Sequence, residues 1–462
     1  MENYYDLSCL GSEYLEFIKN NKECQLPIDY STVKMSEHLK NYHVPLQSVP
    51  ILMDKELADE FAQASKKVLE LVSYIPERIF GYDAEKLKSF YGYKRDDIVQ
   101  ACAASNGFYK PAIARNDFIL TNTGLKALEL NCSTTLGGWN LPFFFSMYRN
   151  ELPVSRFFEQ HADEYEFAVR NTIRCFARFI ADEVTKYAHQ LGIDGHFNMA
   201  MVGNEQLTDV AKQREKLVFS VFEEEVAKKG LTGKIIPVIN ELTPLNLEGD
   251  VLYAGEHRVH VVITTNAKNV CSELLHAFSN NNLIWPDNPL CFAYNNKLNF
   301  ALLHEYKNSV HFSDAEREAI DKYIPLCWEL KNANIDVDGQ SVPMSEYLRS
   351  EKDNLVIKDA TGKQGDDVFI GRTMTDEQWI AAIDTALQQK SWLVQKFCES
   401  VPFTAQSGDC GLKDYDIILG TFTLGDGYGG TQSRMKEKGN SDGVINAAKG
   451  AKEGMIIEVS KR

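Results

Sequence analysis

The sequence LKALELNCSTTLGG, residues 125–138, joins an apolar run to a polar end that contains two glycines. Residues two apart on a β-strand share a face of the sheet, so Glu129 and Asn131 are expected to project together. The preceding segment DFILTNTG, residues 117–124, ends in turn residues, and the two segments predict a β-hairpin. Asp117 lies on its first strand, with Arg115 two residues before it on the same side. The stretch therefore predicts that four polar side chains meet on one hairpin.

The chemistry of these four side chains suggests a magnesium site. Asp117, Glu129 and Asn131 offer hard oxygen atoms, which Mg²⁺ prefers, and Mg²⁺ commonly bridges such ligands to the phosphates of a nucleotide. A guanidinium such as that of Arg115 can stabilise negative charge that develops on a reacting oxygen. On these residues alone, the alternative that they are ordinary polar ends of a surface hairpin stays open.

The composition limits the classes of function. The 462 residues are 44% hydrophobic and 25% charged, which is typical of packed cores and not of a disordered chain. A formal net charge of -16 argues against nucleic-acid binding, because phosphate contacts need a basic surface, and favours small-molecule partners. The sequence shows no signal peptide and no membrane-spanning run, so we expect a cytoplasmic protein without membrane contact; a homo-oligomer is left open.

The cysteines predict neither a disulfide framework nor a zinc site. Ten cysteines are scattered along the chain without a CxxC pair, which favours reduced thiols. Cys132 follows Asn131 directly, but no histidine lies near it in sequence. We therefore expect it to be a packed thiol and not a nucleophile.

Four regions follow one another along the chain, without an internal repeat. Region 1–110 is expected to be mainly helical, since residues 54–75 place apolar side chains on one broad helical face. Region 111–194 contains the hairpin and then a helix over residues 164–192 that ends at Gly192. Region 195–290 alternates strands and helices, which predicts a small sheet with parallel strands. Region 291–462 completes the α/β pattern.

The last two regions contain most of the expected regular elements. Strands are predicted at residues 197–203, 234–239, 258–265, 391–400 and 415–424, and helices at 216–230, 271–278, 296–306 and 376–389. Residues 354–371, NLVIKDATGKQGDDVFIG, predict a strand pair around a glycine-containing loop.

Two nucleotide-binding motifs are matched only in part. The segment GDGYGG, residues 425–430, fits G-x-G-x-x-G, but the residues after it lack the apolar face of a dinucleotide-binding helix. The segment ATGKQGDD, residues 360–367, contains Gly-Lys without a following Ser or Thr. Neither a dinucleotide fingerprint nor a Walker A loop is therefore expected.

Lysines in apolar surroundings strengthen the nucleotide hypothesis. Lys358 lies in the strand LVIKD, where a lysine is poorly placed unless it has an anionic partner such as a phosphate. Lys297 begins a predicted helix, and the loop after Lys358 could close over a phosphate. The backbone of LVQKFCE, at about Lys396 to Cys398, could read an adenine edge. For each lysine alone, a solvated or snorkelling side chain is the commoner case.

Together these segments resemble the circularly permuted branch of the ATP-grasp superfamily, whose relatives include the synthetase of glutathionylspermidine. The resemblance is carried by RNDF with LELN, GDVLYAGEHRVHVVI, YNNKLNFALL, LVIKDATGKQGDDVFIG, LVQKFCE, and GYGGTQSR with VINAAKG, in that order. Ordinary members carry the nucleotide lysines before the acid and Asn cluster, whereas here the cluster comes first. The resemblance implies an α/β (α+β) circularly permuted ATP-grasp fold. In it, an N-terminal helical layer (1–110) precedes an ATP-grasp portion with the metal-binding hairpin (111–194), a Rossmann-like pre-grasp domain (195–290) and a nucleotide-binding portion with a lid (291–462).

The resemblance also implies roles for individual residues. Asp117, Glu129 and Asn131 would bind Mg²⁺, and Arg115 would stabilise the transition-state oxyanion. The residues implied for ATP binding are Lys297, Lys358, Gly362, Gln364, Gly365, Gln395, Lys396, Phe397 and Arg434, with Asn446 as a further group near the phosphates or metal. Ser133, Thr134 and Thr135 would contact substrate.

The implied activity is an ATP-dependent carboxylate–amine ligase. It would form an amide through an acylphosphate, with ATP and Mg²⁺, from a small carboxylate such as an amino acid or peptide and an amine. His260 stands where relatives often have an acid, and Thr264 with Thr265 where they often have a pair of arginines. These departures leave open whether the substrate is the same as in the relatives. A non-catalytic nucleotide-binding protein and an ATP-dependent phosphotransferase are the alternatives.

Overall fold

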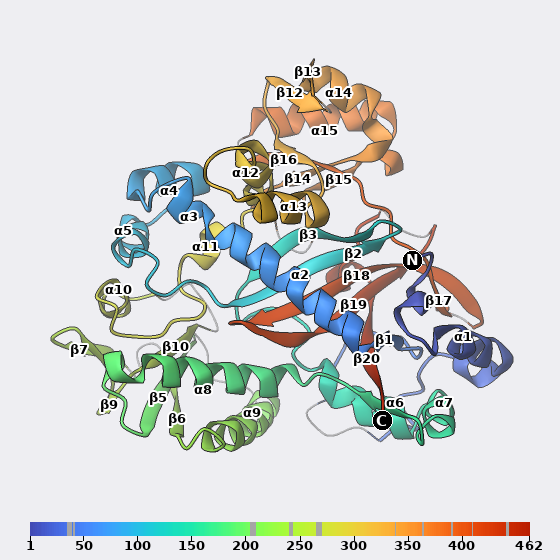
Figure 1. The fold of residues 1–462 in the computed structure, drawn as a ribbon, viewed down its shortest axis with the longest axis horizontal. Coiled ribbons are helices and arrows are strands. Elements are labelled where there is room, and N and C mark those ends of the chain that lie inside the picture. Colours follow the sequence, from blue (N-terminus) through green and yellow to red (C-terminus); the bar gives the residue numbers. More distant parts are fainter. Residues whose placement is uncertain are drawn as a thin grey trace.

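A mixed sheet that draws strands from distant parts of the chain forms the centre of the computed structural model (Figure 1). The structure describes residues 1–34, 39, 42–203, 209–239, 244–264, 270–337, 339–362, 365–389, 391–408, 410–439 and 443–462. The strand order is β1-β20-β19-β18-β2-β3, with β17 paired to β18 and β4 to β20. The bounds are β1 Ile51–Asp54, β2 Ile113–Thr121, β3 Gly124–Cys132, β4 Tyr165–Ala168, β17 Phe403–Gln406, β18 Leu412–Leu424, β19 Gly427–Glu437 and β20 Lys452–Lys461. Only β1 and β20 pair in parallel among these described strands.

The predicted hairpin is confirmed as β2 and β3. Their register pairs Arg115 with Asn131 and Asp117 with Glu129, so the four side chains share one face of the sheet. Gly124 closes the turn with a φ of +114°, a conformation that glycine adopts without strain.

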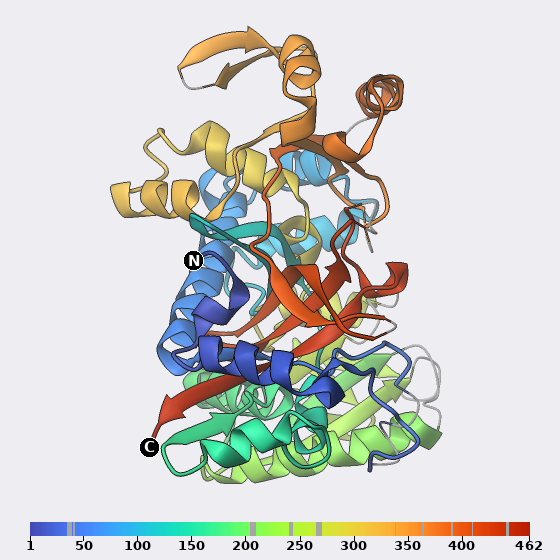
Figure 2. The ribbon, with the colours of Figure 1, turned by 90° about the vertical axis from the view of Figure 1, so that its right-hand side faces the viewer.

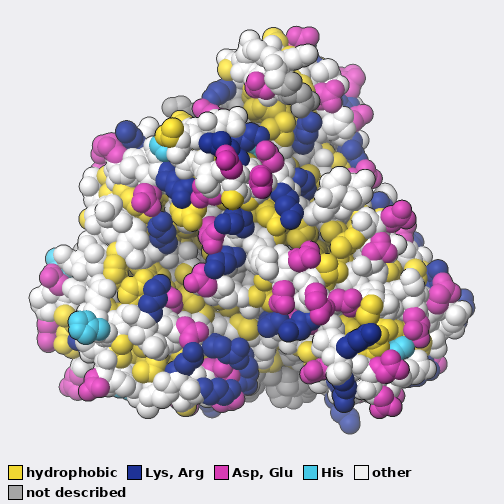
Figure 3. Space-filling view, viewed as in Figure 1, with side chains coloured by type: hydrophobic (Ala, Val, Ile, Leu, Met, Phe, Trp, Pro, Cys, Tyr) yellow, Lys and Arg dark blue, Asp and Glu magenta, His cyan; other side chains and the backbone are white. Residues whose placement is uncertain are grey.

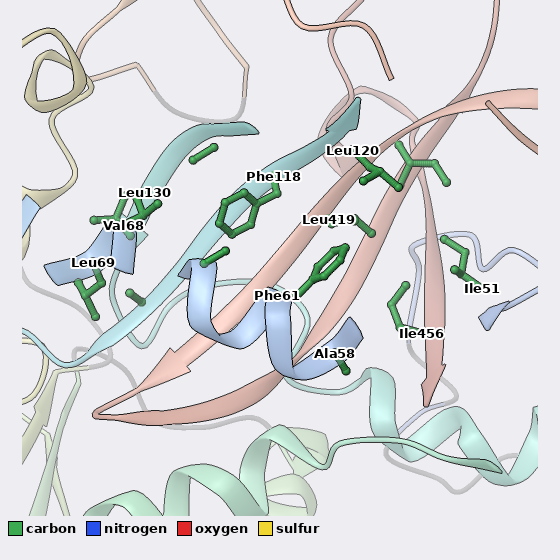
Figure 4. Packing of buried hydrophobic residues seen from close by; sticks show 14 of the residues in the cluster. Ile51, Ala58, Phe61, Val68, Leu69, Phe118, Leu120, Leu130, Leu419 and Ile456 are labelled. Atoms are coloured by element: carbon green, nitrogen blue, oxygen red, sulfur yellow. The ribbon is translucent and has the colours of Figure 1, made fainter. Parts of the chain in front are cut away.

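The helix α2 (Lys55–Ser73) covers the opposite face of the large sheet. Figure 4 shows Phe61 and Val68 of this helix beside Phe118 and Leu419 of the sheet, and all four side chains are buried. The apolar stripe predicted from residues 54–75 is thus the surface that packs on the sheet, and Asp117 lies on the opposite face.

A second sheet contains the predicted strand pair of residues 354–371. Its order is β11-β16-β14-β15, with bounds Cys327–Glu329, Trp392–Lys396, Leu355–Asp359 and Val368–Ile370, and all neighbours are antiparallel. Its one face packs on α14 (Met344–Ser350) and α15 (Asp376–Gln388) through a separate apolar core. Its other face contributes Cys327 and Leu393 to the core of the large sheet. Figure 2 shows it beyond the large sheet, with the ribbon β12–β13 (Asn334–Val337, Gln340–Pro343) outermost.

The predicted parallel sheet of region 195–290 is also present. Its order is β10-β5-β6, with bounds Val261–Thr264, His196–Gly203 and Thr232–Ile239. Apolar side chains of α8 (Thr172–Leu191) and α9 (Asp209–Ala227) pack on one face of it. The helix α8 ends as expected, at Gly192 in the left-handed conformation. A small ribbon of β7 (Leu245–Glu248), β8 (Val251–Ala254) and β9 (His257–Arg258) lies alongside.

The remaining helices surround these sheets. They are α1 Gly11–Asn20, α3 Ile75–Arg78, α4 Ala84–Tyr91, α5 Asp96–Ala104, α6 Phe145–Asn150, α7 Ser155–Gln160, α10 Ser272–Ser279, α11 Cys291–Tyr294, α12 Leu298–Tyr306 and α13 Asp314–Tyr323. None of the helices in the described ranges combines the length and apolar composition needed to cross a bilayer. Figure 3 shows acidic and basic side chains intermixed over the face seen in Figure 1.

Two sequence expectations need correction. Residues 165–168 form the strand β4 against β20, because Phe167 is buried there and the helix begins only at Thr172. Region 1–110 carries the helices α1 to α5, and it also contributes the strand β1, which pairs with β20. The single strand expected at residues 258–265 is divided between β9 and β10, which belong to different sheets.

Candidate functional site

Asp117 is the centre of a buried network of charges on the face of the large sheet opposite α2. Its carboxylate accepts hydrogen bonds from Arg115 Nε (2.9 Å) and Nη2 (3.2 Å), and from Arg434 Nη2 of β19 (2.6 Å). Burial would raise the pKa of this carboxyl, but the two guanidinium groups hold it well below its usual range. Asp117 is therefore ionised at neutral pH and fixes both guanidinium groups.

Glu129 and Asn131 lie beside this network and are more accessible. Asn131 Nδ2 donates to Glu129 Oε1 (3.1 Å) and to Asp117 Oδ2 (3.3 Å). Lys297 Nζ lies 3.5 Å from Glu129 Oε2 and donates to the backbone oxygen of Gly362 (2.6 Å). The Glu129 side chain is 30% exposed, whereas that of Asp117 is 3% exposed.

The donor set fits magnesium through Glu129 and Asn131. Both Asp117 oxygens accept from guanidinium groups, and the role of Asp117 as a magnesium ligand stays a prediction. Among the described residues, no group of three His, Cys, Asp or Glu side chains could hold a metal ion by itself. One carboxylate and one amide oxygen still suit Mg²⁺, because this ion usually completes its shell with water and substrate phosphates.

Lys358 and Gln395 lie on the four-stranded sheet. Lys358 Nζ donates to Gln395 Oε1 at 2.6 Å, and the two residues are 8% and 1% exposed. Burial, and then the nearby Lys297 charge, lower the pKa of Lys358, while the Glu129 charge opposes them. Lys358 of the four-stranded sheet is thus close enough to Glu129 of the large sheet, and to Lys297, for their charges to act on it.

The loop after Lys358 contacts a glycine-containing segment near the end of the chain. Gly365, with a φ of +74°, packs against Val444, and Lys449 Nζ donates to the Gly365 backbone oxygen (2.9 Å). Lys449 also lies 3.2 Å from Asp366 Oδ1. Asn446 accepts from the Ala448 backbone, so its side chain caps the short turn after it. Gln364 lies outside the described residues.

The predicted adenine-reading segment has part of its backbone already paired. The Lys396 backbone N–H donates to the Leu326 carbonyl (2.8 Å), and that of Phe397 to the Asn354 carbonyl (2.8 Å). Reading of an adenine edge would therefore fall to other backbone groups, such as those near Cys398.

Among the predicted substrate residues, Thr134 has an evident structural role. Its hydroxyl lies 2.8 Å from the Thr264 carbonyl oxygen and 2.9 Å from Asp287 Oδ2, while Ser133 and Thr135 contact each other at 2.8 Å. Burial raises the pKa of Asp287 to about 6, against the hydrogen bonds that it accepts from Thr264 and Thr134. This cluster joins the loop after β3 to the end of β10.

His260 and Thr265, which differ from the residues common in relatives, and Cys132, the cysteine next to Asn131, complete the set of predicted residues. His260 is buried, and its Nδ1 accepts from the Asn198 backbone. Thr265 lies outside the described part of the chain. Cys132 is fully buried, and burial raises its pKa, as expected of a packed thiol.

Sequence reasoning missed residues that come from late strands. Gly420 of β18 lies opposite Asp117, and a Cβ there would lie 2.8 Å from Arg115 Cδ. Gln432 of β19 shares the Gly137 carbonyl with Arg115. Glu453 of β20 pairs in register with Arg434, so it extends the row of charges. A glycine inside the apolar strand YDIILGTFTL was the available signal, because such a glycine often marks a close approach.

Comparison with known proteins supports the fold. The sequence matches no protein-family model and no curated protein. It is similar to the solved apo structure of a glutathione synthetase-like effector (GSS30) from Globodera pallida, with a TM-score of 0.54, 13% identity and coverage of 96% of each chain.

Two further solved structures are similar to this chain at lower TM-scores. A putative γ-glutamylcysteine synthetase from Methylobacillus flagellatus KT has a TM-score of 0.44 and 11% identity over 88% of this chain and 89% of that chain. D-alanyl-alanine synthetase A from Vibrio cholerae O1 has a TM-score of 0.28 and 8% identity over 58% of this chain and 89% of that chain. The likeness to the effector shows that this chain shares the mixed α/β fold of that protein, which is consistent with the fold implied by the resemblance of the sequence; circular permutation and a Rossmann-like domain stay predictions.

Proposed function

We propose that this protein is an ATP-dependent carboxylate–amine ligase that makes an amide through an acylphosphate and releases ADP and phosphate. The observation that carries this proposal is the buried Lys358 ammonium, whose hydrogen-bond partner is the neutral amide of Gln395. In the described residues no carboxylate lies within ion-pair distance of it. A buried cation without a counter-ion is costly, and a bound phosphate would offset that cost.

The proposed roles follow from position. Lys358 and Lys297 would hold ATP phosphates, and Glu129 with Asn131 would hold Mg²⁺. When bound, Mg²⁺ would neutralise charge on the transferred phosphoryl group. Arg115, fixed by Asp117, would stabilise the oxygen on which charge develops as the amine attacks the acylphosphate. Gly362 and Gly365 belong to the loop that would cover the phosphates.

A non-catalytic nucleotide-binding protein is the second candidate, and one observation favours it. Because both Asp117 oxygens are bound to guanidinium groups, Glu129 is the accessible carboxylate of the cluster. A site with one free carboxylate could bind ATP with Mg²⁺ and yet support little transfer.

The decisive experiment is a screen of amino acids, small peptides and polyamines in acid–amine pairs for ATP-dependent phosphate release. Product nucleotides would be separated by chromatography, and hydroxylamine would trap an acylphosphate as a hydroxamate. We expect ADP, phosphate and a hydroxamate with the correct acid. AMP as the product would overturn the proposal, ADP without a trapped acyl group would indicate a phosphotransferase, and ATP binding without turnover by any pair would favour the non-catalytic protein.

A further inference from the structure

The loop after β3, residues 133–138, contains the three residues predicted to contact substrate, and it is held near both of its ends. Just before it, the Cys132 backbone exchanges two hydrogen bonds with the Asn295 side chain. Near its far end, the Gly137 carbonyl accepts from Arg115 Nη1 at 3.0 Å. A side chain between these two points provides a third anchor.

This third anchor joins Thr134 to Asp287 and Thr264. The Thr134 hydroxyl oxygen lies 2.8 Å from the Thr264 carbonyl oxygen and 2.9 Å from Asp287 Oδ2. The Thr264 hydroxyl and the Thr264 backbone N–H also donate to Oδ2, at 2.7 Å and 3.0 Å. Because Thr264 ends β10, Asp287 connects the loop after β3 to the three-stranded sheet.

The protonation state of Asp287 decides how many of these contacts are hydrogen bonds. The Thr134 hydroxyl has one hydrogen, and both of its oxygen neighbours are ordinarily acceptors. When Asp287 is ionised, the hydroxyl can donate to one of them, and the other pair of oxygens meets without a hydrogen between them, which is unfavourable in a buried place. When Oδ2 of Asp287 carries a proton, it donates to Thr134, whose hydroxyl then donates to the Thr264 carbonyl. The protonated acid therefore satisfies both contacts of Thr134.

The surroundings of Asp287 favour the protonated acid as well. Its side chain is buried, and among the described residues no Lys, Arg or His nitrogen lies within 4.0 Å of its carboxyl. The charge of Asp287 acts on the Cys291 thiol of α11, which lies near Cys132, and burial raises the pKa of both thiols, so both are neutral. Burial raises the pKa of Asp287 to about 6 against the hydrogen bonds that it accepts. The proton is thus exchanged between about pH 5 and about pH 7.

We propose that Asp287 is a positioning residue for the loop after β3: its proton holds Thr134 against β10, and loss of this proton to solvent weakens that contact and lowers the affinity for the substrate that the loop binds. The effect on substrate affinity rests on the proposed function. The coupling of the proton to the loop does not, because it follows from the contacts of Thr134, Thr264 and Asp287 alone.

Hydrogen exchange of the loop amides tests the coupling without any ligand. Peptides that contain residues 133–138 would be followed by mass spectrometry in the wild-type protein and in Asp287→Asn, at about pH 5 and about pH 8. The asparagine amide donates a hydrogen to Thr134 at every pH, as the protonated acid does. We expect equal exchange in the two proteins at the lower pH, and exchange faster by ~3-fold or more in the wild-type protein at the higher pH.

Two threonine variants keep the test decisive if Asp287→Asn does not fold. Thr134→Val removes the hydroxyl but keeps the shape, so its loop should exchange faster than the wild-type loop at the lower pH and about equally fast at the higher pH. Thr135→Val is the matched control, because the Thr135 hydroxyl contacts Ser133 and not Asp287. It should keep the pH dependence of the wild-type protein. The same pH dependence in Asp287→Asn or in Thr134→Val would overturn the inference.

A kinetic measurement tests the effect on affinity. With the acid identified by the phosphate-release screen, the KM for that acid should rise by ~3-fold or more from about pH 5.5 to about pH 7.5 in the wild-type protein and stay constant in Asp287→Asn, with a smaller change in kcat. A parallel rise in both proteins would overturn the positioning role and leave the proposed function intact. Turnover with no acid would overturn the proposed function, and the exchange data would still decide the coupling of the proton to the loop.

Discussion

At the scale of single residues, the site divides into a fixed part and an accessible part. Asp117, Arg115 and Arg434 are each less than a tenth exposed, and both arginines donate hydrogen bonds to Asp117. Glu129 and Asn131 border this group and are only partly buried. Buried charges are stable only when their partners are all present, so the fixed part can hold a geometry that the accessible part uses.

The substitution Glu129→Gln tests the accessible part. It keeps the shape of the side chain but removes one negative charge from the proposed magnesium site, so turnover should fall by ~10²-fold or more, as expected for a lost ligand charge at a metal-assisted transition state. Circular dichroism should show an unchanged fold. A variant with wild-type turnover would exclude Glu129 as a metal ligand.

Among the elements, the strand β18 packs against the Arg115 side chain through Gly420. Gly420 leaves room for the Arg115 side chain, since a Cβ at this position would lie 2.8 Å from Arg115 Cδ and 3.2 Å from Gln432 Cγ. The glycine is therefore required by the neighbouring strands and not by a turn.

The substitution Gly420→Val should displace Arg115 from Asp117. We expect turnover to fall by ~10²-fold, the typical effect of losing one preorganised oxyanion donor. Nucleotide binding should change much less, because Lys358 lies on another sheet. Gly427→Ala is the control, since among the described residues its Cβ would meet the Leu424 carbonyl alone, at 3.3 Å; equal losses of turnover in both variants would contradict the role of Gly420.

His260, which lies between β9 and β10 and contacts Asn198 of β5, predicts that stability depends on pH. Burial, and then the Arg258 and His196 charges, lower the pKa of His260 to about 4. An unfolded chain takes up this proton near its ordinary pKa of about 6.5, so stability is lost as the pH falls from about 6.5 to about 4. His260→Asn keeps an acceptor for the Asn198 N–H and should reduce the loss of unfolding free energy between pH 7 and pH 4.5 by ~1–2 kcal/mol. Urea titrations at both pH values measure it, and an unchanged difference would contradict the assignment.

The elements differ in how well the sequence predicts them. The hairpin β2–β3, the helix α2 and the strand β14 carry their own periodicity and turn residues, so local patterns suffice. The contacts of Asp117 with Arg434, and of Arg115 with Gly420, depend on strands about three hundred positions away in sequence, which no local pattern encodes. The sequence predicts helix for the strand β4 because YEFA is short and precedes a long helical pattern; its pairing with β20 decides its conformation.

At the scale of the whole molecule, two segments far apart in sequence meet over the proposed nucleotide site. Lys449 contacts the Gly365 carbonyl and Asp366, and so joins the loop of the four-stranded sheet to the segment before β20. The contact is partly solvated, because the Asp366 side chain is 68% exposed. Its individual contribution is therefore modest.

The substitution Lys449→Glu should weaken the contact between the loop at Gly365 and the segment before β20. Repulsion from Asp366 should raise the KM for ATP by ~3- to 5-fold with little change in unfolding temperature, in keeping with the small energies of exposed ion pairs. The double variant Asp366→Lys with Lys449→Glu restores opposite charges and should recover most of the affinity. Failure of the double variant to recover it would show that the ion pair does not hold the loop.

The place of β20 in the large sheet has a consequence for synthesis of the protein. This strand, Lys452–Lys461, lies between β1 and β19, and β1 comes about four hundred residues earlier in the chain. In a ribosome-bound chain, β18 to β20 leave the ribosome last. Until they do, Asp117 lacks its contact with Arg434, and Arg115 lacks the β18 strand on which it packs. Pairing over such a separation is slow. Nascent protein should therefore emerge with an incomplete central sheet, and the proposed nucleotide site should be completed only after translation has passed these strands.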